Sequence, residues 1–275
     1  MSPLRKWMVA AVLAMLAALP GRSAAQVRLL LRFEHNTYLQ FESTEAYVSI
    51  YNDTDRALCI GDGSSNLFSE LSFLVEQRRD DWLPKRSVGP LVDGLILEPG
   101  EQRDVVVDLT RGYDLTAMGR YLVRAILRDK GRVVAVSPQV SLDVVRGLEL
   151  ESVQRAVPGA FDQIRTYSVR YWRRNRFEYA FLSVDEEATA SNYGVFQLGK
   201  IVRTEKPVVT VERDGKVTVR HLCAPDCYIR TVFMSEEEGV RFVDQQYEAP
   251  DGTPYPNGPV RRHLPIPVPT PIPVR

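Results

Sequence analysis

The chain has 275 residues and a formal net charge of zero, with 44% hydrophobic and 25% charged residues. This is the composition of an ordinary globular protein, and the length allows one or two domains, each with a sizeable core. Neither half carries an excess of basic residues, which argues against a protein that binds nucleic acid.

The N-terminus has the pattern of a secretory signal peptide. Arg5 and Lys6 form a positive segment, an apolar run extends from Trp7 to Leu19, and Ser23-Ala24-Ala25 supplies small residues before a predicted cut ahead of Gln26. The apolar run is too short for a membrane span, and no second run follows it. We therefore expect a periplasmic or extracellular protein with neither a membrane span nor a lipid anchor. Its mature chain carries three more acidic than basic side chains.

Residues 26–146 are predicted to form an all-β domain. Short apolar runs alternate with turn-forming residues, and no helical period of 3.6 residues is visible. The expected strands are Val27–Phe33, Tyr38–Phe41, Tyr47–Tyr51, Leu58–Ile60, Leu71–Glu76, Leu95–Leu97, Val105–Leu109 and Tyr121–Leu127. So many short strands within about 120 residues are typical of a β-sandwich.

Turn residues suggest how some of these strands connect. Glu98-Pro99-Gly100-Glu101 predicts a turn, because Pro presets one backbone angle and Gly accepts a positive φ. Asp129-Lys130-Gly131 is predicted to be a three-residue hairpin loop, which would place Leu127 opposite Val133 and Ala125 opposite Ala135.

Tyr121 lies two residues before the inward-facing Val123, as in the tyrosine corner of immunoglobulin-like domains. Val123 occupies the place of the second cysteine of antibody domains, so no disulfide between the sheets is expected. A wider pattern consists of Leu97-Glu98-Pro99-Gly100-Glu101, Val107-Asp108-Leu109-Thr110, Tyr113-Asp114-Leu115 and Gly119-Arg120-Tyr121.

This pattern resembles the immunoglobulin-like β-sandwich modules of secreted bacterial proteins, including those next to deuterolysin-type metallopeptidases. The resemblance covers about residues 40–145 and implies a fold, whereas such sandwiches host unrelated functions. The peptidase itself is absent, because His35, His221 and His263 are the chain's three histidines and none lies in a His-Glu-x-x-His motif.

Residues 147–249 are predicted to form a second, smaller, mainly-β domain. Gly147 and Pro158-Gly159 suggest the joint between the domains. In Val208–Arg220, a three-residue loop at Arg213-Asp214-Gly215 would pair Val211 with Val217 and Val209 with Val219. Further strands are expected at Ile164–Trp172, Phe177–Val184, Tyr193–Val202, Tyr228–Met234 and Val240–Tyr247.

The last segment, residues 250–275, is rich in proline. Its composition predicts an extended polyproline II conformation, either as a solvated tether or as a ligand for an aromatic groove on a partner.

Arginine and aromatic residues alternate in the first hairpin of the second domain, and this cluster is the candidate binding site. Guanidinium groups beside stacking aromatic rings could hold an anionic ligand. The alternative is a hairpin with a charged tip whose aromatic residues pack in the core. The candidate residues are Arg170, Tyr171, Trp172, Arg173, Arg174 and Arg176.

Cys223 and Cys227 are predicted to form a disulfide, which export permits, and Cys59 is expected to be a buried thiol. A metal site formed by His221 with these two cysteines is the alternative, but the hairpin register favours a core histidine. We expect neither a metal nor a cofactor.

Acidic residues offer weaker candidates. Asp185-Glu186-Glu187 and Glu236-Glu237-Glu238 are interpreted as solvated runs, because calcium loops space their ligands and include Gly. The carboxylate pairs Asp80-Asp81 and Asp104 with Asp108 would suit a glycosidase, but alternation with Val105 and Val107 places the second pair on a solvent face. No catalytic residue is assigned.

The function favoured by the sequence is an exported, non-enzymatic binding or structural module of the bacterial envelope. It would contact another envelope or secreted protein, or a glycan. Two alternatives remain. One is an inhibitor or accessory subunit of a secreted protease, and the other is a hydrolase with its site in the second domain.

Overall fold

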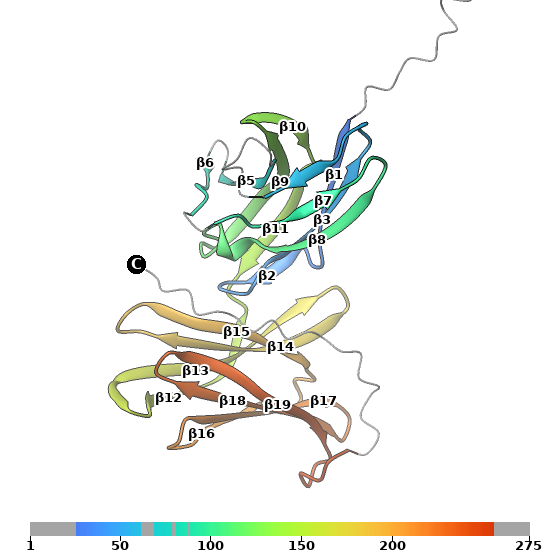
Figure 1. Ribbon diagram of the computed structural model, residues 1–275. Helices are drawn as coiled ribbons and strands as arrows, with labels where there is room; N and C mark the ends of the chain where they lie inside the picture. The colour runs from blue at the N-terminus through green and yellow to red at the C-terminus, as the bar shows by residue number, and fades with distance from the viewer. Residues whose placement is uncertain (1–25, 62–68, 79–80, 87–88, 256–275) are drawn as a thin grey trace, which may run out of the picture.

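The computed structural model describes residues 26–61, 69–78, 81–86 and 89–255. Nearly all regular structure in these residues is β-strand, which confirms the all-β prediction. The strands form two groups stacked along the long axis of the molecule (Figure 1), an N-terminal half that ends at Val145 and a C-terminal half that begins at Leu148. The predicted signal peptide and residues 256–275 lie outside the described residues.

The N-terminal half has one three-stranded sheet, one six-stranded sheet and one small two-stranded sheet. The first has the order β1-β3-β8, the second has the order β2-β11-β9-β5-β6 with β10 also paired to β9, and the third joins β4 to β7. The strands are β1 (Val27–Phe33), β2 (Thr37–Leu39), β3 (Glu45–Asn52), β4 (Leu58–Ile60), β5 (Glu70–Arg78), β6 (Asp81–Trp82), β7 (Leu95–Leu97), β8 (Gln102–Asp108), β9 (Gly119–Asp129), β10 (Arg132–Val136) and β11 (Val140–Val145).

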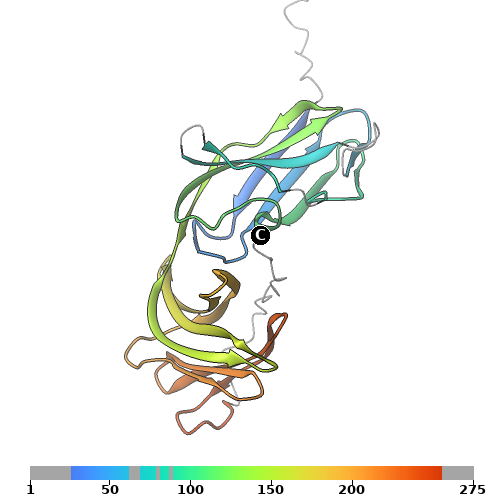
Figure 2. The same cartoon turned by 90° about the vertical axis from the view of Figure 1, so that its left-hand side faces the viewer.

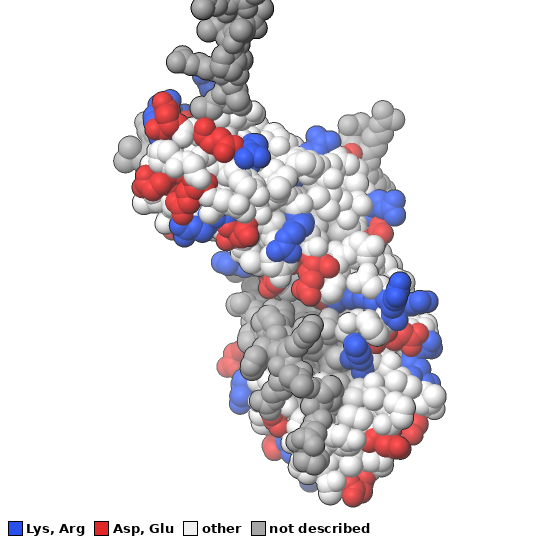
Figure 3. Space-filling view, turned by 90° about the vertical axis from the view of Figure 1, so that its right-hand side faces the viewer, with Lys and Arg blue, Asp and Glu red and all other residues white. Residues whose placement is uncertain are grey.

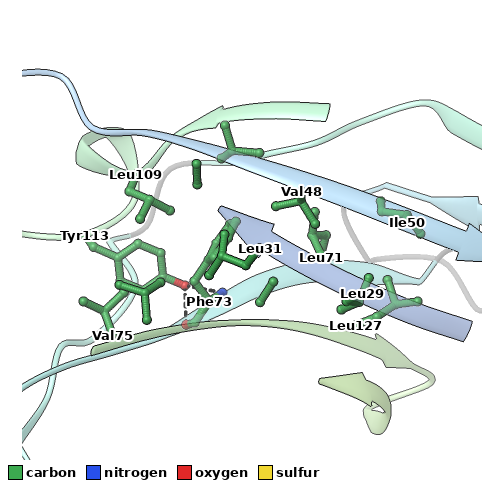
Figure 4. Packing of buried hydrophobic residues seen from close by; sticks show 14 of the residues in the cluster. Leu29, Leu31, Val48, Ile50, Leu71, Phe73, Val75, Leu109, Tyr113 and Leu127 are labelled. Carbon is green, nitrogen blue, oxygen red and sulfur yellow. Dashed lines mark hydrogen bonds between the residues drawn. The ribbon is translucent and has the colours of Figure 1, made fainter. Parts of the chain in front are cut away.

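Alternating apolar residues of the two larger sheets form one hydrophobic core. Every second residue of β3 is buried, and Val48 and Ile50 are fully excluded from solvent. They face Leu71 and Phe73 of the other sheet across the cluster shown in Figure 4. This two-layer packing gives the N-terminal half a sandwich-like architecture, as the alternation of apolar and polar residues predicts.

Two tyrosines attach loops to this core. Tyr113 follows the short 3-10 helix η1 (Leu109–Arg111), and its buried hydroxyl accepts from the backbone N of Phe73 (2.8 Å) and donates to the Phe73 carbonyl (2.7 Å). Tyr121 donates its hydroxyl proton to the carbonyl of Ala117, four residues upstream, at 2.6 Å. The second bond has the geometry of a tyrosine corner.

The predicted register of the β9–β10 hairpin is wrong. Lys130 and Gly131 both have positive φ, at 49° and 76°, and form a two-residue loop rather than a three-residue loop. Such a loop suits a type I′ turn, whose twist matches the flanking strands. Val133 therefore pairs with Arg128, and a bulge then brings Ala135 opposite Leu127.

The C-terminal half consists of two four-stranded antiparallel sheets, with the orders β12-β13-β14-β15 and β16-β17-β18-β19. In each sheet, neighbouring strands are consecutive in the chain. The strands are β12 (Leu148–Val157), β13 (Ala160–Arg174), β14 (Phe177–Glu186), β15 (Ser191–Lys200), β16 (Val208–Val211), β17 (Lys216–Ala224), β18 (Cys227–Glu236) and β19 (Gly239–Glu248). Their inner faces share a second hydrophobic cluster, which includes Val169, Leu182, Phe196, Val219 and Phe233.

Predictions for this half were partly confirmed. The pairs Val211–Val217 and Val209–Val219 are present, with Gly215 at positive φ in the three-residue loop. Strand β12 was missed, and Pro158-Gly159 is not a joint, because it forms the turn between β12 and β13 within one sheet. Gly147, with φ of 71°, does lie between the two groups of strands. A domain boundary at residue 146 stays a prediction.

Candidate functional site

The outer face of the β12–β15 sheet is the surface that carries most of the predicted site. Val169 and Leu182 point into the core shared with the second sheet, so their alternate neighbours on β13 and β14 point the opposite way. Figure 2 shows the long strands β12 and β13, in yellow-green, curving up toward the N-terminal half. Strand pairing aligns Arg174 with Phe177, Trp172 with Tyr179, Arg170 with Phe181 and Ser168 with Ser183 on this outer face.

The six predicted binding residues do not gather in one place. Because side chains alternate along a strand, Arg170, Trp172 and Arg174 lie on the outer face, and Tyr171 and Arg173 lie on the inner face. Tyr171 packs against the core, with the guanidinium of Arg203 4.1 Å from its ring centroid. Arg173 and Arg176 are exposed.

The two outer-face arginines have carboxylate partners. Arg170 donates to Glu149 Oε2 at 2.9 Å. Arg174 is 4% exposed and donates to Glu42 of the N-terminal half and to Gln197 Oε1 at 2.9 Å. Their positive charges are therefore largely neutralised within the protein.

Arg174 and Glu42 form a buried contact between the two halves. The guanidinium carbon of Arg174 lies 4.7 Å from the ring centroid of Phe181 and 5.6 Å from that of Tyr38. Glu42 Oε2 also accepts from the backbone N of Leu39 at 2.8 Å. Burial raises the pKa of Glu42, although Arg174 opposes the shift. No sequence pattern pointed to this pair, because its members are 132 residues apart.

A small apolar cluster surrounds this ion pair. Leu39, Phe181 and Val195 form its centre, and Phe41, Trp172 and Tyr179 pack around them. Phe41 has φ of 68°, a strained value for a bulky residue, in the turn that also positions Glu42. The strain is held in place by contacts on both sides of the junction.

Beyond the ion pair, the outer face presents an aromatic row, which we define as Trp172, Phe177 and Tyr179. Trp172 and Tyr179 are half-buried and lie opposite each other, and Phe177 is 50% exposed. Lys200 Nζ lies 3.7 Å from the ring centroid of Phe177. Among the described residues, neither the indole N–H of Trp172 nor the hydroxyl of Tyr179 has a hydrogen-bond partner. The aromatic row thus combines apolar surface with two available donors.

A different arginine, Arg165, has a structural role. It is fully buried, donates to Ser235 Oγ and to the carbonyls of Glu236, Glu237 and Gly239, and stacks 3.6 Å from the ring centroid of Tyr193. These bonds tie β13 to the turn between β18 and β19. The Glu236–Glu238 run is exposed, as predicted.

The second acidic run was misjudged. Glu186 is 4% exposed and accepts from the Tyr193 hydroxyl at 2.6 Å. Asp185 accepts from Ser183 and from Asn192, at 2.9 Å and 2.7 Å. Both carboxylates are therefore parts of internal networks rather than a solvated run.

The cysteine and histidine candidates meet on the second sheet. Cys223 and Cys227 contain free thiols with their sulfurs 3.4 Å apart, so the predicted disulfide is not present. A bulge at Cys223 brings the two residues close across the β17–β18 hairpin, and Cys223 Sγ donates to the Cys227 carbonyl instead. Burial raises the pKa of Cys223 to about 12, which disfavours the thiolate that would begin oxidation. Cys59, expected to be buried, is half-buried in β4.

His221 is a core histidine, as predicted. It is 1% exposed, and Nε2 lies 3.1 Å from the Lys200 carbonyl, to which it donates. Burial lowers its pKa to about 4. No group of three His, Cys, Asp or Glu side chains in the described part of the chain could hold a metal ion.

The carboxylates considered for a glycosidase that the structure describes lie on β6 and β8 and do not form a common site. Asp104 is exposed, and Asp108 accepts from the backbone N and the hydroxyl of Thr110, as the cap of η1. Asp81 is exposed in β6, and Asp80 lies outside the described residues.

The outer face of the β1-β3-β8 sheet carries two arginine–tyrosine stacks. The guanidinium of Arg28 lies 4.8 Å from the Tyr51 ring centroid, and that of Arg32 lies 4.3 Å from the Tyr47 ring centroid. Both rings therefore have a face covered by the protein's own cations. Figure 3 shows acidic and basic side chains interspersed over both halves on the face in view.

Comparison with protein-family models and with curated proteins found no match to this chain. Across the described residues, no helix is long and apolar enough to cross a membrane.

Proposed function

We propose that this protein is an exported, non-enzymatic binding module of the bacterial envelope that acts by protein–protein contact through the aromatic row. The observation that carries the proposal is the pair Trp172 and Tyr179, half-buried neighbours whose donors have no partner among the described residues. Partly exposed aromatic side chains with a polar tip are typical anchors of protein interfaces.

Several features support this class of function. The N-terminal sequence has the pattern of a signal peptide, and the Tyr121 hydrogen bond is of the kind found in immunoglobulin-like sandwiches. Two of the four arginines of the predicted site, Arg170 and Arg174, are paired with Glu149 and Glu42, so an anionic ligand has less charge to bind than the sequence suggested.

A protein partner fits the surface better than a glycan. Sugars bind proteins by stacking on open aromatic faces, whereas the rings of Tyr47, Tyr51 and Phe177 each carry one of the protein's own cations. An inhibitor or accessory subunit of a secreted protease is one form that a protein-binding module could take, and the identity of the captured partner would reveal it.

The test is a pull-down from the source cell's envelope extract with residues 26–275. We expect a specific partner to be captured by this chain and lost with Trp172→Ala. Trp82→Ala is the matched control, because Trp82 is 44% exposed on a distant strand. Tyr179→Phe removes only the hydroxyl and should weaken capture without changing the thermal midpoint. Equal capture by all four chains would contradict the proposal.

A further inference from the structure

The chain ends in a segment that suits a surface such as the aromatic row. Residues 256–275 contain proline at every second position from Pro265 to Pro273. A polyproline II segment exposes its backbone carbonyls and has few backbone donors. Such segments are recognised by grooves lined with aromatic side chains that donate hydrogen bonds.

The outer face of the β12–β15 sheet offers these features together. Trp172 and Tyr179 supply ring surface and two donors without partners among the described residues, and Phe177 extends the aromatic row. The alternating Ile266, Val268 and Ile272 of the tail are apolar and could pack against these rings. The acceptors of the tail match the unused donors of the sheet.

The aromatic row is the part of this face that stays partly exposed. Ser168 and Ser183, farther along, are 1% and 4% exposed; Ser183 donates to Asp185 Oδ2, and its register partner Val195 belongs to the apolar cluster at the junction. Trp172 and Tyr179 are half-buried, and Phe177 is 50% exposed. An occupant of this face would therefore contact the aromatic row.

The tail is long enough to reach this face. Tyr255 is held beside β19 by a hydrogen bond from its N to the Tyr247 carbonyl, at 2.8 Å. From there, twenty residues of polyproline II extend about 60 Å at ~3.1 Å per residue. Two packed sheets are only about 10 Å apart, so the segment can pass around the sandwich to the opposite sheet.

We propose that residues 256–275 bind in cis to the outer face of the β12–β15 sheet, across the aromatic row. The inference rests on the proposed function, because it assigns the same surface an internal occupant that competes with the partner. Tethering gives the tail an effective concentration of about millimolar, so a weak contact is enough for occupancy. The partner then binds by displacing the tail.

Tryptophan fluorescence tests this directly. Trp7 lies in the predicted signal peptide, so Trp82→Phe leaves Trp172 as the single tryptophan of residues 26–275. This chain is compared with a variant of equal length and charge in which the five prolines from Pro265 to Pro273 are replaced by serine. We expect the variant's Trp172 emission to shift to longer wavelength and its quenching by acrylamide to increase.

A synthetic peptide of residues 256–275, added to the serine variant, should reverse both changes, and a peptide carrying the five serines should not. Identical emission and quenching in the two chains, or no response to the proline peptide, would overturn the inference. These readouts need no partner, so they are independent of the pull-down. Capture that depends on Trp172 but not on the tail prolines would retain the proposed function and reject the internal occupant.

Discussion

Two buried polar side chains, Arg165 and His221, bind backbone carbonyls. The Arg165 guanidinium binds three carbonyls in the turn between β18 and β19, and His221 binds the carbonyl of Lys200. Charged arginine remains charged at any physiological pH, whereas histidine can lose its proton and enter the core neutral. Of these two buried side chains, therefore, only His221 makes the free energy of unfolding depend on pH.

We predict that His221 destabilises the fold in mild acid. The unfolded chain protonates histidine near pH 6.5, whereas the buried side chain has a pKa of about 4. The contribution of neutral His221 to the free energy of unfolding is fully present above pH 6.5. As the pH falls toward 4, the free energy of unfolding decreases by up to about 3 kcal/mol. Urea unfolding of wild type and His221→Gln between pH 7 and 4 measures the difference. Parallel curves for the two proteins would refute the assignment.

At the scale of elements, hairpin turns determine how the sheets pack. Gly215 in the β16–β17 turn has φ of 88°, and a Cβ there would lie 2.3 Å from the carbonyl oxygen of Ser235 and 3.0 Å from Pro158 Cγ. Three hairpins thus meet at one glycine, which lies against the β12–β13 turn and strand β18.

We predict that Gly215→Ala is much more destabilising than Gly252→Ala. Gly252 has a similar φ of 85° but no atom within 4 Å of an added Cβ, so it measures the backbone strain alone. We expect about 1 kcal/mol for Gly252→Ala and about 3 kcal/mol for Gly215→Ala, because the second also forces backbone atoms apart. Chemical denaturation of both variants provides the comparison. Equal losses of stability would show that strand β18 can shift without cost.

The β17–β18 hairpin leads to a prediction about oxidation. Cys223 and Cys227 need only a small movement to reach bonding distance, and closing so short a loop stabilises a protein by about 2 kcal/mol. We expect chain exported to an oxidising compartment to show one reactive thiol under denaturing conditions, that of Cys59, and reduction to lower its free energy of unfolding. Three reactive thiols in the exported protein would contradict this expectation.

Sequence patterns predicted the features that depend on residues close together in the chain. The Val209–Val219 register followed from alternation and the position of Gly215, and the core location of His221 followed from that register. The β9–β10 register failed because Lys130, a residue with no turn preference, adopts positive φ. Strand β12 was missed because its side chains are mostly exposed and polar, so it lacks a clear apolar alternation.

At the scale of the whole molecule, the junction between the two halves depends on a buried ion pair. Sequence patterns placed Arg174 on a charged hairpin tip, but its burial depends on Glu42 and Tyr38, which only the folded arrangement brings near it.

We predict that the Glu42–Arg174 pair is strongly coupled. Their side chains are 12% and 3% exposed, and removing one partner of a buried pair leaves an uncompensated charge, at a cost of about 3–5 kcal/mol. Glu42→Leu and Arg174→Met should each lose this much stability, and the double variant should lose less than the sum. The control is Arg120→Met at the exposed pair with Asp143, with a loss below about 1 kcal/mol. Additive losses at the buried pair would contradict the prediction.

The order of strands also has a kinetic consequence. In the C-terminal half, each strand within a sheet pairs with its neighbour in the chain, whereas the N-terminal half must join β3 to β8, β5 to β9 and β2 to β11. Contacts between distant segments form slowly, because the intervening chain must be ordered before they contribute energy. The half that emerges last from the ribosome is thus expected to fold first. The N-terminal strands would meanwhile remain exposed to proteases and to unwanted pairing.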